Sequence, residues 1–210
     1  PGNLDAFYYP ERGKIANIMR TSGYKVYDQY YERNFAYRTS ESCVSQTIYR
    51  HEEDKMLDTK LIAPCPYIDS KLTRESVVMW RESYNIALRQ SKIGYACGGC
   101  ANQLVRKYAE IPARGALLLC QNIKPLKNYG FKDWENMIMV SPDNILEICD
   151  YLFKNPKEMQ YIADNGRKMV YEKHTPIRQA RHIIKAIEAI KAGTFGGSYW
   201  EDGEFIIKQL

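Results

Sequence analysis

The sequence lacks any apolar run long enough to cross a membrane. A spanning helix needs roughly 18 or more consecutive apolar residues, and no apolar stretch of the 210-residue chain approaches that length. The first ten residues, PGNLDAFYYP, have neither the basic start nor the apolar core of a signal peptide. We therefore predict a cytoplasmic protein without a membrane span. The missing initiator Met indicates a domain cut from a longer chain.

Cysteine is too sparse for a disulfide-built domain. Six cysteines are spread along the chain, and only Cys97 and Cys100 lie close together in sequence. Small disulfide-built domains are denser in Cys than this, so we expect most thiols to be reduced and buried. A zinc site needs two further ligands beyond one Cys pair, and no second paired motif exists. We therefore expect no metal.

A strong excess of one charge is also missing. The net charge is only +5, and Asp and Glu accompany Lys and Arg along the whole chain. A basic stripe or block would be needed to indicate a nucleic-acid interface. We therefore predict no nucleic-acid partner, although a mildly basic protein suits phosphate-bearing ligands.

Strand and helix patterns alternate along the rest of the chain. The expected strands are 24–27, 47–50, 60–63, 93–97, 116–120 and 137–140, and the expected helices are 13–22, 73–90, 101–113, 141–154, 155–173 and 175–192. Alternating strands and helices predict a parallel sheet with helices packed on it. The predicted fold class is α/β, a doubly wound, mostly parallel Rossmann-like sheet with C-terminal helices.

Residues 91–121 are the most informative stretch, because a strand, a Gly98-Gly99 turn, a helix and a second strand follow one another. Such a unit presents backbone N–H groups to a phosphate. Glycine also permits a tight connection without any ligand, and both interpretations stay open. The flanking Cys97 and Cys100 form a C-x-x-C, typical of thioredoxin-like redox proteins when a helix starts there.

Glu110 lies late in the helix expected over 101–113, shortly before the apolar run 116–120. A carboxylate there accepts hydrogen bonds from ribose hydroxyls in nucleotide sites, or it simply faces solvent. Arg106 and Lys107 precede Glu110 in the same expected helix. They either neutralise a diphosphate or are exposed.

An ordered series of motifs resembles a known family. Glu110-Ile-Pro-Ala-Arg-Gly115 before the apolar run is followed by similar patterns at 143–156, 162–167 and 172–178, and Pro66-Tyr-Ile-Asp69 precedes them. The series, over residues 61–192, resembles the nucleotide-sugar-binding half of GT-B glycosyltransferases of the group-1, CgeB-like branch. The resemblance implies a transferase moving a sugar from a nucleotide-diphosphate donor to a glycan hydroxyl, with no metal required.

By this resemblance we expect UDP as the nucleotide of the donor, and a deoxysugar such as L-rhamnose is one candidate for the sugar. Glu110 would bind the donor ribose, and the glycine turn would face the diphosphate and the sugar. The implied donor-binding residues are Gly98, Gly99, Cys100, Ala101, Asn102, Arg106, Lys107, Glu110 and Gly115.

The sequence departs from the family where catalysis is concerned. Many relatives carry a second Glu eight residues before the ribose-binding one, and this chain has Asn102 there. A retaining mechanism built on that acid is therefore not expected. The candidates for a catalytic base are Asp69, His51 and Asp54, and a structural role for each stays open. A redox protein using Cys97 and Cys100 and a non-catalytic nucleotide-sugar-binding module are the alternative functions.

The resemblance also predicts the domain organisation. Residues 1–60 would be a reduced acceptor side or additional Rossmann elements, residues 61–192 the nucleotide-sugar-binding domain, and residues 193–210 a C-terminal tail. Because a full acceptor domain is missing, we expect one module of a multidomain glycosyltransferase like those of large DNA viruses, fused to other glycan-modifying domains.

Overall fold

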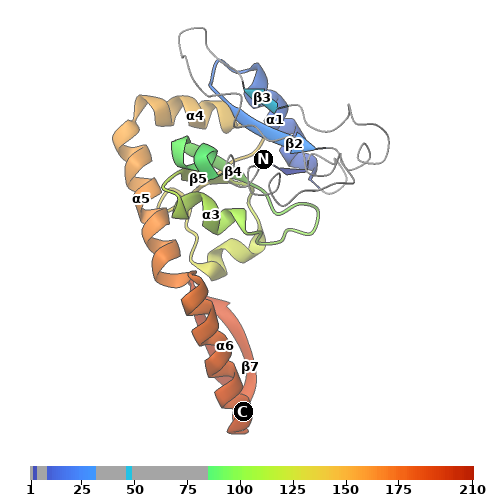
Figure 1. Ribbon diagram of the computed structural model, residues 1–210, viewed down its shortest axis with the longest axis vertical. Coiled ribbons are helices and arrows are strands. Elements are labelled where there is room, and N and C mark those ends of the chain that lie inside the picture. Colours follow the sequence, from blue (N-terminus) through green and yellow to red (C-terminus); the bar gives the residue numbers. More distant parts are fainter. Residues whose placement is uncertain (1, 4–8, 32–45, 49–84) are drawn as a thin grey trace. The chain divides into compact units, whose positions relative to one another are not determined.

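The computed structural model describes residues 2–3, 9–31, 46–48 and 85–210 (Figure 1). The chain divides into two compact units. Unit 1 spans residues 1–91, 99–101 and 141–149, and unit 2 spans residues 92–98, 102–140 and 150–210. The strand expected over 60–63 and most of the helix expected over 73–90 lie outside the described residues. The last six residues of that helix, 85–90, are helical as predicted.

In unit 1, helix α1 (Pro10–Thr21) confirms the predicted helix 13–22 and begins three residues earlier, with Pro in its first turn. Strands β1 (Gly2–Asn3), β2 (Tyr27–Tyr31) and β3 (Gln46–Ile48) form a three-stranded sheet, parallel between β1 and β2 and antiparallel between β2 and β3. The strand predicted over 24–27 overlaps β2 only at its last residue. The Ser22 hydroxyl donates to the Met19 carbonyl and accepts from the Tyr24 N–H, which turns the chain there instead.

The sheet of unit 2 consists of β4 (Ile93–Ala96), β5 (Leu117–Cys120) and β6 (Ile138–Met139), in that order and all parallel. These strands confirm the three predicted over 93–97, 116–120 and 137–140. All four residues of the central β5 are buried, as expected for a parallel strand covered on both faces. The α/β class is therefore correct, while the doubly wound arrangement stays a prediction.

Helix α3 (Lys107–Ala113) begins six residues later than predicted. Gly99 and Asn102 have φ angles of 67° and 49°. Such left-handed residues interrupt a right-handed helix. The Gln103 N–H donates to the Gly98 carbonyl at 3.0 Å and closes a separate turn over residues 98–103. The prediction of a helix from residue 101 was therefore wrong in its first six residues.

Helix α4 (Ile145–Lys154) follows β6 and ends where predicted. It starts at residue 145 and not at Ser141, because Ser141–Asn144 forms a turn in which the Asn144 Oδ1 accepts from the Ser141 N–H at 2.8 Å. Helix α5 (Pro156–Lys173) matches the prediction and packs on α3 and β5. Gly166 permits α5 to lie close to its neighbours, because a Cβ there would lie 2.5 Å from the Asn136 carbonyl oxygen and 3.3 Å from Pro112 Cβ of α3.

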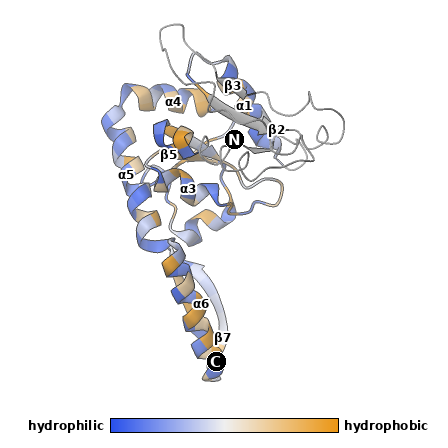
Figure 2. Ribbon diagram, in the orientation of Figure 1, coloured by the Kyte–Doolittle hydropathy of each residue, from blue (hydrophilic) through white to orange (hydrophobic). Residues whose placement is uncertain are grey.

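Helix α6 (Pro176–Lys191) matches the prediction, and its N-cap Thr175 accepts a hydrogen bond from the Arg178 N–H. Strands β7 (Phe195–Glu201) and β8 (Glu204–Gln209) form an antiparallel hairpin across the predicted tail. We name α6 with this hairpin the C-terminal arm, and the remainder of unit 2 the body. Figure 1 shows α6 and β7 leading away from α5, and Figure 2 shows hydrophobic and hydrophilic residues alternating along α6.

The arm joins the body at the six-residue 3-10 helix η2 (Lys124–Tyr129). The Gly203 N–H, at the hairpin tip, donates to the Asn128 carbonyl at 2.8 Å, and Lys173 Nζ donates to the Asp202 carbonyl at 2.6 Å. Within the described part of the chain, every helix is too short or too polar to span a bilayer.

Candidate functional site

The carboxyl edge of the body's parallel sheet is the first place to look for a ligand site. Here β4 and β5 end side by side at Ala96 and Cys120. The Gly98 N–H, two residues beyond β4, donates to Gln121 Oε1 at 3.2 Å. Gln121 therefore ties the turn after β4 to the end of β5. The only sequence signal for Gln121 is its position directly after an expected strand, which does not distinguish it from its neighbours.

The backbone geometry of the turn at residues 98–102 requires glycine at two positions. A Cβ on Gly98 would lie 2.9 Å from Ile123 Cγ2 and 3.0 Å from the Asn102 backbone. Gly99 takes the left-handed φ that glycine tolerates best. Gly98 and Gly99 are buried, whereas Cys100, Ala101 and Asn102 are exposed. The exposed half of the turn is thus the part that is accessible to a ligand.

The expected link between this turn and a helix N-terminus is absent. Helix α3 begins at Lys107, eight residues after Gly99, so Gly98-Gly99 does not start it. The phosphate-binding unit expected from the sequence is therefore two features, a turn and a later helix start, that follow the same strand.

Glu110 lies in the first turn of α3, and not late in a long helix as the sequence suggested. Because α3 leads from the end of β4 back to the start of β5, its first turn lies toward the carboxyl edge of the sheet. A carboxylate is also favoured at the positive end of a helix dipole. The correction therefore moves Glu110 toward the carboxyl edge of this sheet.

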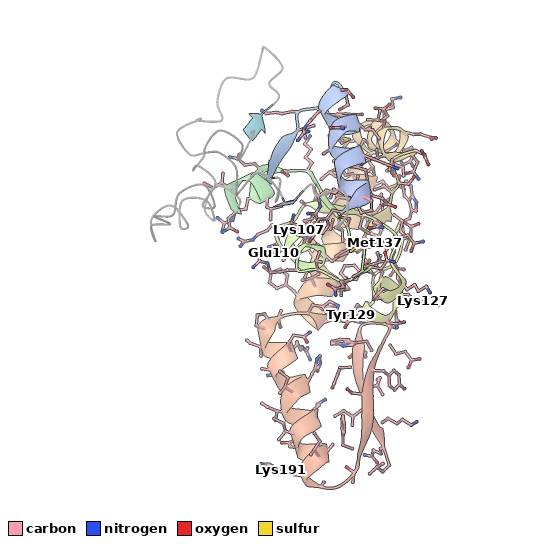
Figure 3. The ribbon with its side chains drawn as sticks, turned by 90° about the vertical axis from the view of Figure 1, so that its right-hand side faces the viewer. Lys107, Glu110, Lys127, Tyr129, Met137 and Lys191 are labelled. Atoms are coloured by element: carbon pink, nitrogen blue, oxygen red, sulfur yellow. The ribbon has the colours of Figure 1, made fainter. Side chains whose placement is uncertain are left out.

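Arg106 pairs with Glu110 at this helix start. The distance from Arg106 Nε to Glu110 Oε1 is 2.8 Å, and the two side chains are 79% and 28% exposed. In Figure 3 the labelled Lys107 and Glu110 lie close together on α3. Two basic residues and one acid thus share a partly exposed helix start, which suits a ligand carrying both phosphates and hydroxyls.

Gly115 is not brought together with the other predicted donor residues. It follows α3, has a φ of 86°, and precedes β5 by two residues, where the Leu117 N–H donates to the Lys92 carbonyl. It therefore lies toward the amino edge of the sheet. Its conformation accounts for the glycine without a ligand.

The cysteines do not form the arrangement of a redox site. Cys97 and Cys100 are not disulfide-bonded, and the first is buried and the second exposed. A helix that starts at the C-x-x-C is what lowers a thiol pKa in thioredoxin-like proteins, and α3 starts seven residues after Cys100. Cys120 is also free, and burial, with the Asp133 carboxylate as a smaller cause, raises its pKa to about 12. Cys120 is therefore a packing residue.

The remaining predicted residues add little to the site. His51, Asp54 and Asp69, the candidates for a base, lie outside the described residues and stay predictions.

Across residues 2–3, 9–31, 46–48 and 85–210, no three His, Cys, Asp or Glu side chains are grouped to hold a metal ion.

A comparison with protein families adds evidence that is independent of this geometry. A family model described as glycosyl transferase-like matches residues 66–185, which is more than half of the chain. The match includes the turn at residues 98–102, the Arg106–Glu110 pair and helices α3 to α5. None of the curated proteins matches the chain.

Proposed function

The chain belongs to the glycosyl transferase-like family, and we propose that its domain transfers a sugar from a nucleotide-diphosphate donor to a glycan hydroxyl. The resemblance recognised in the sequence is thereby confirmed at the level of a glycosyltransferase domain. The donor, the acceptor and the roles of individual residues belong to the proposal.

The observation that carries the proposal is the Arg106–Glu110 pair in the first turn of α3. A carboxylate that is 28% exposed is accessible to the two hydroxyls of a ribose, which donate hydrogen bonds to its oxygens. The Arg106 side chain is 79% exposed, and an ion pair between residues four apart in a helix contributes only about 0.5 kcal/mol. The proposal is that donor binding separates Arg106 from Glu110.

The released Arg106 and the neighbouring Lys107 supply positive charge to the diphosphate. The leaving diphosphate of a glycosyl transfer needs such stabilisation from Arg, Lys or backbone N–H groups. The exposed turn residues Cys100, Ala101 and Asn102 are adjacent in sequence to left-handed Gly99. Turns of this type often direct successive N–H groups at an anion. With these groups the transfer requires no metal ion.

The finer assignments follow the family resemblance. UDP is the proposed nucleotide, and a deoxysugar such as L-rhamnose is one proposed sugar. Asp69 is the proposed base for the acceptor hydroxyl, because it follows an expected strand and so belongs at the carboxyl edge. Position 102 holds Asn where many members of the resembled family carry a second acid, so the proposal includes no catalytic role for that position.

The test is a thermal-shift screen of the full chain with UDP-, GDP- and dTDP-sugars. A donor that binds only the folded state raises the melting temperature. We expect one nucleotide class to do so and Glu110→Ala to abolish the shift. Glu172→Ala, which removes an exposed acid from α5, is the matched control and keeps the shift. No shift with any nucleotide, or an equal shift in Glu110→Ala, contradicts the proposed donor site.

Transfer is then distinguished from binding alone. The donor that stabilises the chain is incubated with it, and released nucleoside diphosphate is measured with and without glycan acceptors. Release that depends on Glu110 supports the transferase. A bound donor that is neither transferred nor hydrolysed identifies the non-catalytic module instead.

A further inference from the structure

One face of α6 carries five isoleucines that the structure leaves exposed. Their side chains are between 46% and 68% exposed. At 3.6 residues per turn they fall within less than half of the helix circumference. We name this set the isoleucine face; it consists of Ile177, Ile183, Ile184, Ile187 and Ile190. A contiguous exposed apolar face is typical of an interaction surface.

The opposite side of α6 is already occupied by the hairpin. The ring of His182 stacks on Phe205 of β8 at 5.0 Å and lies edge-on to Trp200 of β7 at 5.2 Å. On the helical wheel Arg178 and Lys185 lie beside His182, on this hairpin side. The isoleucine face is therefore directed away from the hairpin and from these two basic residues.

The isoleucine face has the spacing of a seam between two helices. Ile177, Ile184 and Ile187 follow the first and fourth positions of a seven-residue repeat, which are the positions that pack in a helix pair. The remaining two seam positions hold the small Ala180 and, at the C-terminal end, Lys191. A partner helix therefore fits along this side of α6.

The two flanks of the seam differ in chemistry. One flank consists of Ile183 and Ile190, and the other consists of Arg181 and Glu188. Arg181 and Glu188 are exposed, and the ion pairs among the described residues include neither of them. One flank is therefore apolar, and the other offers one positive and one negative charge to a partner.

These flanks distinguish the two directions in which a second copy of α6 could lie. In a parallel pair, each flank meets the opposite flank of the other helix. Arg181 and Glu188 would then face isoleucines and lose water without gaining a partner, which is unfavourable. In an antiparallel pair about a two-fold axis, each flank meets its own counterpart. The isoleucine flanks then meet each other, and so do the charged flanks.

The antiparallel register that packs the isoleucines also pairs the charges. When Ile184 of one copy lies against Ile187 of the other, Arg181 of the first copy comes opposite Glu188 of the second, because each lies within one turn of these isoleucines. The two-fold axis repeats this contact, so two Arg–Glu pairs border the apolar seam. The face is thus complementary to a second copy of itself both in spacing and in charge.

We propose that two copies of the chain associate through the isoleucine faces of their α6 helices, antiparallel about a two-fold axis. Because α6 leads away from α5 (Figure 1), the two α5 helices then lie at opposite ends of the helix pair. This surface is separate from the proposed donor site and does not depend on it.

The size of the face determines the strength of the dimer. Five partly exposed isoleucines offer less than the roughly 800 Å² that each partner of a standard interface buries. We therefore expect a weak dimer, with a dissociation constant on the order of 100 μM. The chain is then monomeric at a few micromolar and dimeric only when concentrated or held at high local concentration.

The experiment is sedimentation equilibrium of the full chain between roughly 10 and 500 μM, on either side of the expected constant. The average mass is expected to rise from the 24.4 kDa of one copy toward twice that value. Ile184→Asp is expected to abolish this rise, because it places a charge without a partner in the apolar seam. Its matched control, Tyr161→Asp, places the same charge at an exposed aromatic of α5 and is expected to keep the dimer.

Charge reversals test the direction of the pair. Arg181→Glu or Glu188→Arg alone sets like charges against each other twice, and each is expected to weaken the dimer about tenfold. Arg181→Glu lowers the net charge of +5, so general repulsion between copies does not explain its loss. Arg181→Glu combined with Glu188→Arg restores opposite charges and is expected to return the constant to within about threefold of wild type. Lys168→Glu, at an exposed position of α5, is the control and leaves it unchanged.

Three outcomes overturn the proposal. One is a chain that stays monomeric over the whole range, and another is a dimer that Ile184→Asp leaves intact. The third is a combined charge reversal that dimerises no better than the single reversals, which excludes the antiparallel pair. Circular dichroism checks that each variant is folded, and Ile187→Gln replaces Ile184→Asp if that variant is not.

Discussion

The body and the C-terminal arm are stabilised in different ways. In the body, Leu117, Leu118 and Leu119 are at most 1% exposed, and α5 buries an apolar face against α3 and β5. Helix α6, described along its whole length, has no buried residue. The arm is attached instead through rings, such as Trp200 stacked on Tyr129 at 4.7 Å, and through hydrogen bonds at the hairpin tip.

This difference indicates that the body and the arm of unit 2 differ in rigidity. Apolar burial gives the body most of its free energy of folding, so the body is rigid enough to hold a donor site. Few buried contacts make a region open locally at low free-energy cost. We therefore expect the arm to open before the body unfolds. Figure 3 shows Tyr129 at the junction where the two regions meet.

The largest expected difference in the free energy of unfolding is between a substitution in the buried core of the body and one on the exposed apolar face of α6. Leu118→Ala, in the middle of β5, is expected to lower the free energy of unfolding by about 2–5 kcal/mol, because it leaves a cavity in a packed core. The matched change Ile187→Ala, on the exposed face of α6, is expected to change it by roughly 0.5 kcal/mol or less. Urea denaturation measures both. Similar losses for the two variants would contradict the comparison.

The next effect concerns the attachment of the arm. Trp200→Ala removes the ring that stacks on Tyr129 and lies near His182 and Phe205. We expect about 1–2 kcal/mol less protection of β7 and β8 in hydrogen exchange, with little change in β5. Tyr199→Ala, at a neighbouring position of the hairpin that is 49% exposed, is the control. Equal loss of protection in the body would show that the arm and the body unfold together.

A change of pH is expected to have a smaller effect on the stability of the C-terminal arm. Burial lowers the pKa of His174 from its usual 6.5, with Lys173 and His182 adding to the shift and the Tyr129 carbonyl and Glu204 opposing it. The His174 Nε2 lies 2.8 Å from that carbonyl oxygen.

Desolvation likewise lowers the pKa of His182, with Lys185 and Arg178 in the same direction and Glu204 opposed. Histidines with lowered pKa values bind fewer protons folded than unfolded. Their contribution to the stability of the folded state is therefore complete above pH 6.5, and it decreases as the pH falls through the pKa values of the folded state.

Hydrogen exchange of the hairpin at about pH 5 and about pH 7.5, either side of the ordinary histidine pKa, measures this effect. Rates are first corrected for the intrinsic pH dependence. We expect protection of β7 and β8 to decrease at the lower pH, and His174→Gln with His182→Gln to remove the difference. An unchanged pH dependence in the double variant would assign it to other groups.

The smallest effect is expected at the C-x-x-C of Cys97 and Cys100. Cys97→Ser with Cys100→Ser is expected to leave sugar transfer within about twofold of wild type. A serine at Cys97 costs stability of roughly 1 kcal/mol, and a serine at Cys100 keeps the backbone N–H that the proposed donor site uses. Glu110→Ala, in the same transfer assay, is the contrasting variant and loses activity. Loss of activity in the cysteine variant with donor binding intact would revive the redox interpretation.

Local signals made the strands and the long helices predictable. The apolar run 116–120 had to be a buried strand, and β5 is one. Asn155-Pro156 and Thr175-Pro176 begin α5 and α6 at the residues expected, because proline in the first turn and a capping side chain act within a few residues. Residues 51, 54 and 69, predicted as base candidates, stay predictions.

The candidate site was predictable only in part. The sequence identified Glu110 and Arg106 separately, as candidates for binding the ribose and the diphosphate, and the structure pairs them. It misplaced the helix start, because left-handed Gly99 and Asn102 separate the turn from α3. It also grouped Gly115 with residues that lie toward the opposite edge of the sheet.

The sequence by itself determined the α/β alternation, the glycosyltransferase family and the ends of α5 and α6, since each depends on patterns carried by neighbouring residues. Only the tertiary structure decided that Gln121 holds the turn at Gly98, that Glu110 lies in a first helical turn, and that α6 leaves its isoleucines exposed. The start of α3 depends on the left-handed φ angles of Gly99 and Asn102. The other two features depend on contacts between segments distant in sequence, or on their absence. Periodicity and capping cannot encode such contacts, because both act over single turns of the chain.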